Sequence, residues 1–203
     1  MLQKYKTEML GTFWDSCTDQ AFGALSEMIQ RDVKKIKPSI HVETINNVPN
    51  MLNPKEITTT LVYTLVNGEI KCTVVFSSSL RHFLRLIDIL LKKKIDYYDA
   101  LNEENEPVVI ELGNIINGYI VSSLNRLFES KFDFNESVIS VNPYRAIEDF
   151  DFGNIYKEKV RLLTFKSGFS VHGEDIQGKL LLLLNDNKTD MLLEAIVKKI
   201  IIK

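Results

Sequence analysis

The sequence has little cysteine, glycine or proline, and neither sign of charge is in large excess. Its 203 residues include only two cysteines, Cys17 and Cys72, which excludes a disulfide scaffold and, because the two lie far apart, a zinc site built on cysteine pairs. Nine glycines and five prolines are too few for a collagen-like or low-complexity chain. Lys and Arg total 25 against 27 Asp and Glu, whereas a dedicated nucleic-acid binder needs a basic face. We therefore expect no nucleic acid among its partners.

Long hydrophobic runs are also missing. No segment approaches the roughly 20 uninterrupted apolar residues that span a bilayer. Residues 1–10 have neither an apolar signal core nor a small-residue cleavage site. Hydrophobic residues make up 45% of the chain and charged residues 26%, which is typical of a soluble globular protein and excludes disorder as the main state. The composition predicts a cytoplasmic protein that does not contact a membrane.

Metal-ligating side chains do not cluster in the sequence. His41, His82 and His172 are scattered, with no second ligand at metal spacing. The segment Asp149–Asn154 has the acidic character of a calcium loop but lacks the closing Glu. We predict no metal site, and interpret the histidines as surface or packing residues and the segment as an acidic loop.

The spacing of apolar residues predicts four helices. In each of them apolar side chains recur every three or four residues, and polar side chains occupy the opposite side. The helices are expected at residues 8–32, 80–94, 107–130 and 189–202. Pro107 is compatible with the first turn of the third helix, because the amide hydrogen that proline lacks would be unpaired there.

Runs of β-branched and apolar residues predict strands between these helices. Asn67-Gly68 separates two such runs, and this dipeptide is the strongest short signal for a β-hairpin. Residues 39–57 are expected to form mainly loop, with a short strand near 41–44. The other strands are expected at residues 58–65, 71–76, 132–142, 160–167, 169–171 and 179–185. Helices and antiparallel strands in separate clusters predict the α+β class, and the lack of a Pro-, Gly- or Ser-rich linker predicts one domain over residues 1–203.

A weak internal repeat relates the first and third helices. When Leu25 is aligned with Leu124, Thr12 and Asp15 fall opposite Glu111 and Asn114. Each of these helices precedes strand-like sequence. The alignment predicts two related helix-plus-strand units packed side by side.

The helix at residues 107–130 carries a polar stripe. At about 100° per residue, one side of this helix collects Pro107, Glu111, Asn114, Gly118, Ser122 and Asn125. Glu111 and Asn114 are i, i+3 neighbours that point the same way. Gly118, one turn further, has no side chain to project from the helix surface. Two interpretations stay open from the pattern alone: an ordinary solvated helix face, or a surface that contacts another protein.

The motif on this helix resembles a known family. Glu111-Leu112-Gly113-Asn114-Ile115, followed by Asn117-Gly118, resembles the E-x-x-N signature helix of the CheC/CheX/FliY phosphatases of bacterial chemotaxis, with CheX the closer match. As in that family, the motif follows a long first helix and a hairpin that leads into a helix, here LVYTLVNGEIKCTVVFSSS. The resemblance covers about residues 8–187, so that residues 188–203 are expected to be a helical addition to a CheX-like core.

The resemblance implies a function and roles for five residues. The substrate would be the phosphoaspartate of the response regulator CheY, with Asn114 orienting the attacking water and Glu111 pairing with a lysine of the regulator. Gly118, Asn117 and Ser122 would contact that partner. The chain would need no cofactor of its own, because the regulator supplies the Mg²⁺. The resemblance also implies a homodimer.

Two departures from the family pattern motivate other hypotheses. Pro107 stands where the family usually has Asp or Ser, and Asn135 and Glu136 stand near the place where it usually has a proline. The alternatives are a non-catalytic module that binds a response regulator, and a structural component of a chemotaxis or flagellar assembly. The segment Gly178–Asn185 is apolar on both faces, which predicts either an interior strand or a strand covered by a partner chain.

Overall fold

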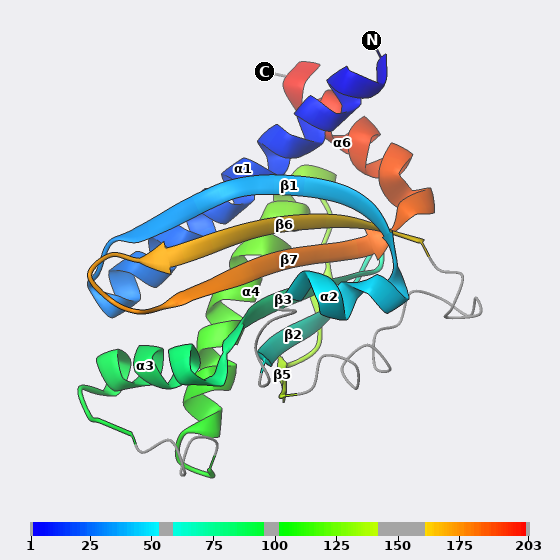
Figure 1. The fold of residues 1–203 in the computed structure, drawn as a ribbon. Coiled ribbons are helices and arrows are strands. Elements are labelled where there is room, and N and C mark those ends of the chain that lie inside the picture. The colour runs from blue at the N-terminus through cyan, green and yellow to red at the C-terminus, as the bar shows by residue number, and fades with distance from the viewer. Residues whose placement is uncertain (1, 53–58, 96–101, 142–160, 202–203) are drawn as a thin grey trace.

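An antiparallel sheet forms the centre of the protein (Figure 1). The structure, a computed structural model, describes residues 2–52, 59–95, 102–141 and 161–201. The sheet has seven strands, in the order β1 (Val33–Thr44), β6 (Arg161–Val171), β7 (Gln177–Asn185), β3 (Cys72–Ser79), β2 (Thr59–Asn67), with β4 (Asp133–Phe134) and β5 (Val138–Ser140) both paired to β2. The predicted α+β class, with an antiparallel sheet, is confirmed.

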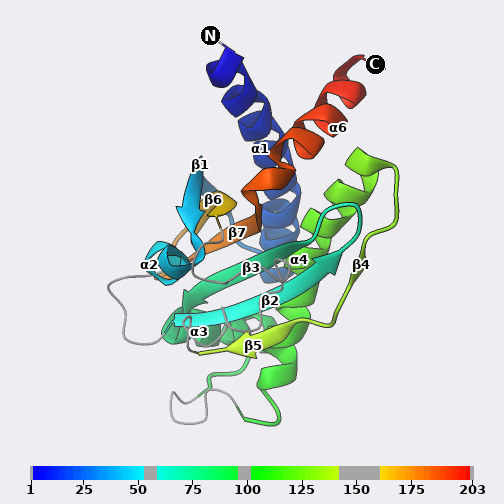
Figure 2. The same ribbon diagram turned by 90° about the vertical axis from the view of Figure 1, so that its right-hand side faces the viewer.

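Helices cover both faces of the sheet, but unequally (Figures 1 and 2). Two long helices lie side by side on one face, and two shorter ones flank them; among the described residues, one short helix lies on the opposite face. The helices on the first face are α1 (Leu2–Ile29), α4 (Glu106–Phe128), α3 (Leu80–Leu91) and α6 (Thr189–Ile201), and the opposite face carries α2 (Val48–Leu52). Short 3-10 turns, η1 (Ile45–Asn47) and η4 (Asp186–Lys188), precede α2 and α6.

Each face of the sheet has its own apolar core. On the side of α1 and α4, Trp14 packs on Phe165 with ring centroids 5.7 Å apart, and Phe76 stacks on Phe169 at 5.6 Å. On the side of α2 the smaller core includes Leu181 and Leu183. Strand β7 is therefore interior to the sheet and covered on both faces by its own chain, so its two-sided apolar character requires no partner subunit.

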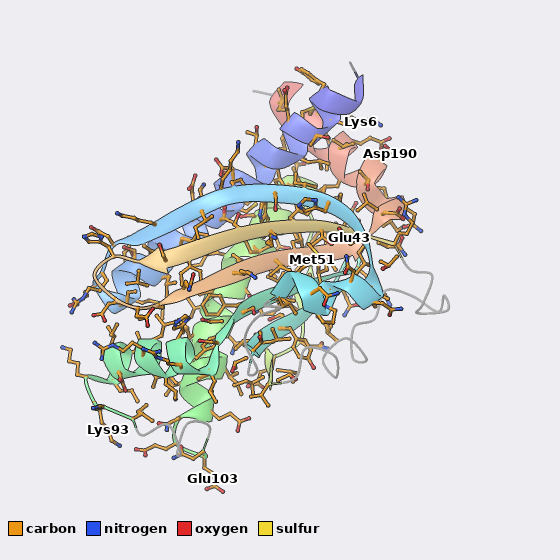
Figure 3. All side chains as sticks on the ribbon, viewed as in Figure 1. Lys6, Glu43, Met51, Lys93, Glu103 and Asp190 are labelled. Carbon is orange, nitrogen blue, oxygen red and sulfur yellow. The ribbon has the colours of Figure 1, made fainter. Side chains whose placement is uncertain are left out.

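Short contacts fix the two peripheral helices. The ammonium group of Lys179 on β7 donates to the carbonyl oxygens of Met51, at 3.0 Å, and Leu52, which ties α2 to the sheet. Lys6 of α1 and Asp190 of α6, labelled in Figure 3, form an ion pair with a nitrogen–oxygen distance of 3.0 Å. The predicted C-terminal helix thus packs against α1 beyond the edge of the sheet (Figure 2).

Three predictions about the strands were wrong in extent. Residues 33–44 form one long edge strand, whereas the sequence predicts mainly loop over 39–57 with a short strand near 41–44; an edge strand tolerates the lysines and the proline that mask its pattern. Pro38 lies where the register between β1 and β6 shifts, between Ile36 and Ser39. Residues 132–142 form two short strands instead of one, whereas β6 runs unbroken through Gly168.

The sheet order agrees with the internal repeat. Strand β1 follows α1 and forms one edge of the sheet, and β4 and β5 follow α4 and form the other edge. The remaining strands are arranged symmetrically about the β7–β3 pair. Each long helix therefore lies next to the edge strand that follows it in sequence, as the alignment of residues 15 and 114 predicts.

Helix α4 is apolar enough, and long enough, to cross a bilayer by length and composition. Its mean hydropathy reaches 1.2, and no other helix of the described residues meets the same test. Half of its apolar window is buried inside the protein, where Val109, Leu112 and Ile116 are almost fully covered by the sheet and α1. The hydropathy of α4 is accounted for by this packing.

Both cysteines should be unreactive in the folded protein. Cys17 and Cys72 are buried and free, and burial raises the pKa of each thiol to about 12. Only the thiolate attacks disulfide reagents, and at pH 8 it would be about one part in ten thousand of each group. We expect no reaction with an aromatic disulfide reagent until denaturant is added, and then two equivalents; rapid release of one equivalent from native protein would contradict the burial.

Candidate functional site

Helix α4 presents one side to the core and one to the surface. Its N-terminal turn contains Pro107, as predicted, and the side chain of Asn102 accepts the N–H of Asn105 at 2.9 Å just before the helix begins. The buried side carries Val109, Leu112, Ile116, Ile120 and Leu124. Glu111 is exposed on the other side.

Gly113 sets the distance between α4 and the sheet. A Cβ atom built at this position would lie 2.1 Å from the Cγ1 atom of Val62 on β2, so no other residue fits without movement of the helix. This close approach holds the neighbouring Asn114 at a defined height above the edge of the sheet.

Asn114 is half-buried, and its side chain makes one hydrogen bond to the described part of the chain. The backbone N–H of Ser137, in the segment that links β4 to β5, donates to Asn114 Oδ1 at 3.0 Å. Because the oxygen faces this segment, the amide NH₂ group faces the other way. No hydrogen bond joins that NH₂ group to a described residue.

Gly118 leaves an open area next to Asn114. A Cβ atom at Gly118 would meet no atom within 4 Å. Ser122, one turn further, is half-buried, and its hydroxyl lies 3.5 Å from a guanidinium nitrogen of Arg126. The structure therefore brings Glu111, Asn114, Gly118 and Ser122 together along one side of α4, and we call these four residues the α4 surface.

Asn117 does not belong to the α4 surface, and its predicted contact with a partner is wrong. Its side chain is 1% exposed and points toward β2. The amide nitrogen donates to the carbonyl oxygen of Val62 at 3.2 Å and to the hydroxyl of Thr64 at 3.0 Å. Asn125, which the helical pattern placed on the same stripe, also turns inward, because its Oδ1 accepts the N–H of Phe132 at 2.7 Å.

The equivalent position on α1 is occupied by an ion pair within the chain. Asp15 lies 2.6 Å from the ammonium nitrogen of Lys35 on β1, and Asp19 lies 2.5 Å from it. Partial burial alone would lower the pKa of Lys35, but the hydrogen bonds to Asp15 and Asp19 outweigh it and raise that pKa above its usual value. Asp15 and Asp19 of α1 thus bind the edge strand β1 of the same chain.

Sequence reasoning missed the role of Ser137. The resemblance places the family's usual proline near Asn135 and Glu136. The residue that hydrogen-bonds to Asn114 is instead Ser137, 23 residues further along the chain. A proline at this position could not donate the bond to Asn114, because proline has no backbone N–H. The number of residues between Asn114 and Ser137 was the one available sequence signal. It does not reveal a hydrogen bond between a helix and a distant loop.

The described part of the chain contains no group of three or more His, Cys, Asp or Glu side chains that could hold a metal ion. His82 is buried, and its Nδ1 lies 3.1 Å from the carbonyl oxygen of Gln177. The acidic segment Asp149–Asn154 lies outside the described residues.

Comparison with known proteins identifies the fold. No protein-family model matches the chain, and no curated protein matches its sequence. Among solved structures, FliY from Thermotoga maritima superposes with a TM-score of 0.74 at 16% identity, covering 96% of this chain and 97% of FliY. The chain has the CheC/CheX/FliY fold.

Two further structures with this fold were solved as complexes. One is the CheX–CheY–BeF3–Mg²⁺ complex from Borrelia burgdorferi, with a TM-score of 0.54 and 16% identity over 84% of this chain and 96% of that one. The other is the FliG–FliM complex from H. pylori, with a TM-score of 0.62 and 13% identity over 94% of this chain and 98% of that one. The CheC/CheX/FliY fold is thus shared by proteins crystallised with different partners, and the predicted resemblance in fold is confirmed.

Proposed function

We propose that the protein dephosphorylates the phosphoaspartate of a CheY-type response regulator, which binds to the α4 surface. The observation that carries the proposal is the placement of Asn114, whose Oδ1 atom accepts the Ser137 N–H and which lies one turn before the open area at Gly118. The solved complex of CheX with CheY, in the same fold, supports a regulator as the partner.

The proposed hydrolysis requires this chain to position groups rather than to supply covalent catalysis. An acyl phosphate hydrolyses when a water is held in line with the phosphorus, so catalysis depends mainly on positioning and on charge stabilisation. The amide of Asn114 can donate to a water or to a phosphoryl oxygen without ionising. In this proposal the Mg²⁺ belongs to the regulator, and the chemistry requires neither a nucleophile nor a cofactor from this chain.

Glu111 would orient the two proteins. Its carboxylate is exposed one turn before Asn114, within reach of a cation on the partner. An exposed ion pair of this kind adds little affinity but fixes register and favours the correct partner. Substitution of Glu111 is therefore expected to raise KM more than it lowers kcat.

A leucine at Gly118 should block docking without unfolding the protein. The variant Gly118→Leu fills the open area, where a Cβ has no neighbour within 4 Å, and it suits a helix better than glycine. We expect at least about a tenfold loss of regulator binding and of phosphate release, because a bulky side chain would separate the two surfaces. Binding is measured by calorimetry and release by a phosphate-sensor assay.

Gly23→Leu on α1 is the matched control, since Gly23 is exposed and, like Gly118, has no atom within 4 Å of a built Cβ. This variant should bind and hydrolyse like the unaltered protein. If Gly118→Leu bound and hydrolysed as well as Gly23→Leu, the α4 surface would not be the docking site.

A second candidate function is a non-catalytic module of a chemotaxis or flagellar assembly. The fold is shared with FliM, which was solved with FliG, and Pro107 replaces an acid or serine of the phosphatase pattern. Binding of a regulator or a switch protein without faster phosphate release would favour this candidate over the phosphatase.

The homodimer and the cytoplasmic location stay predictions. The mass of one chain is 23.3 kDa, so light scattering after gel filtration separates a monomer from a dimer directly. The covered faces of β7 provide no support for a dimer, which would have to use another surface.

A further inference from the structure

A buried polar cluster lies beneath Asn114. It consists of Thr64 on β2, Asn117 on α4 and Ser137 between β4 and β5, whose exposed fractions are 2%, 1% and 4%. The three side chains come from segments far apart in sequence, at the place where α4 crosses the edge of the sheet.

Hydrogen bonds connect this cluster to the surface. The amide of Asn117 donates to Thr64 Oγ1 at 3.0 Å, and the hydroxyls of Thr64 and Ser137 share a hydrogen bond of 2.6 Å in which either oxygen can be the donor. The N–H of the same Ser137 donates to Asn114 Oδ1 at 3.0 Å. One continuous chain of bonds therefore runs from the interior to Asn114.

The polar cluster stabilises the core less than apolar side chains would. Asn117 Oδ1 is buried and has no hydrogen-bond partner among the residues that the structure describes, and a buried acceptor left unpaired is destabilising. Apolar side chains of similar size would avoid that penalty. What the polar arrangement provides is a fixed place for Ser137, and through it a fixed orientation of the Asn114 amide.

We propose that Thr64 and Ser137 are positioning residues for Asn114. The Thr64 hydroxyl anchors Ser137, and the Ser137 N–H holds Asn114 Oδ1 toward the protein, so that the amide cannot turn over and always presents its NH₂ group to the regulator. This inference rests on the proposed function for its consequence in catalysis, but the anchoring itself exists in the free protein and is measured there.

The variant Thr64→Val tests the anchor, because it keeps the shape of Thr64 and removes its hydroxyl. We expect kcat for phosphate release to fall about tenfold with KM unchanged, since a loosely held group loses positioning but not affinity. Thr64→Ser restores the hydroxyl and should restore kcat to within about twofold. In an Asn114→Ala background Thr64→Val should have no further effect on the rate, because the group it positions is gone.

A readout without the regulator separates this inference from the proposed function. Hydrogen exchange at the Ser137 N–H should be slow in the unaltered protein and in Thr64→Ser, and at least about tenfold faster in Thr64→Val and Asn114→Ala. If the unaltered protein releases no phosphate but shows this exchange pattern, the proposed function fails and the anchor stands. Unchanged Ser137 exchange in Thr64→Val would overturn the anchor whatever the activity. An equal loss of kcat in Thr64→Val and Thr64→Ser would overturn it as well.

Discussion

Asn114→Ala should lower phosphate release at saturating regulator by about a hundredfold, the loss typical of removing one group that positions or stabilises the reacting atoms. The side chain is half-buried, and its one hydrogen bond to a described residue is the bond from Ser137, so its removal leaves the core of α4 intact. Binding of the regulator should change by less than about threefold, because Glu111 and the open area at Gly118 remain. Stopped-flow measurement of phosphate release gives kcat and KM separately.

Asp15→Ala is the matched control for this variant. Asp15 occupies the equivalent place on α1 in the internal repeat but is paired with Lys35 of its own chain. Its removal should leave both kcat and KM unchanged. A hundredfold loss in Asp15→Ala, or full activity in Asn114→Ala, would place the chemistry elsewhere.

Gly113→Ala should destabilise the protein by about 2–3 kcal/mol, although alanine favours helix formation over glycine by about 1 kcal/mol. The new methyl group would lie 2.1 Å from Val62 Cγ1, and a short branched side chain in a strand cannot move away without shifting the backbone. Helix α4 would have to lift from β2. Denaturant unfolding, with the slope m compared between variants, measures the free energy of unfolding.

Gly118→Ala, five residues along the same helix, is the control for Gly113→Ala. A Cβ there meets nothing within 4 Å, so the variant should be more stable than the unaltered protein by about 0.5–1 kcal/mol. Equal effects of the two substitutions would mean that α4 does not approach β2 as closely as the structure shows.

Local sequence patterns predicted the elements that carry one clear signal, such as a turn dipeptide or a regular apolar spacing. The Asn67-Gly68 dipeptide located the β2–β3 hairpin, and the apolar spacing located α4 with Pro107 in its first turn. Strand β1 was largely missed because an edge strand is half-solvated and carries lysines and Pro38, so neither alternation nor a continuous apolar run identifies it.

The candidate site was predictable only for the side chains that face outward. Helical spacing placed Glu111, Asn114 and Gly118 together, and the structure agrees. It could not show that Asn117 turns under the helix toward Thr64, because a difference of one residue rotates a side chain by about 100° and only the position of β2 decides which side is buried. The bonds from Ser137 to Asn114 and from Lys35 to Asp15 join segments that no local pattern relates.

The most direct test of the account is the rate of phosphate release from a phosphorylated CheY-type regulator of the same organism, in the presence of Mg²⁺, as the concentration of the unaltered protein is raised. The account predicts that the rate constant rises above that of the regulator alone and saturates as the complex forms. A rate constant that stays at the value of the regulator alone, at concentrations where calorimetry shows the complex, would contradict the phosphatase function.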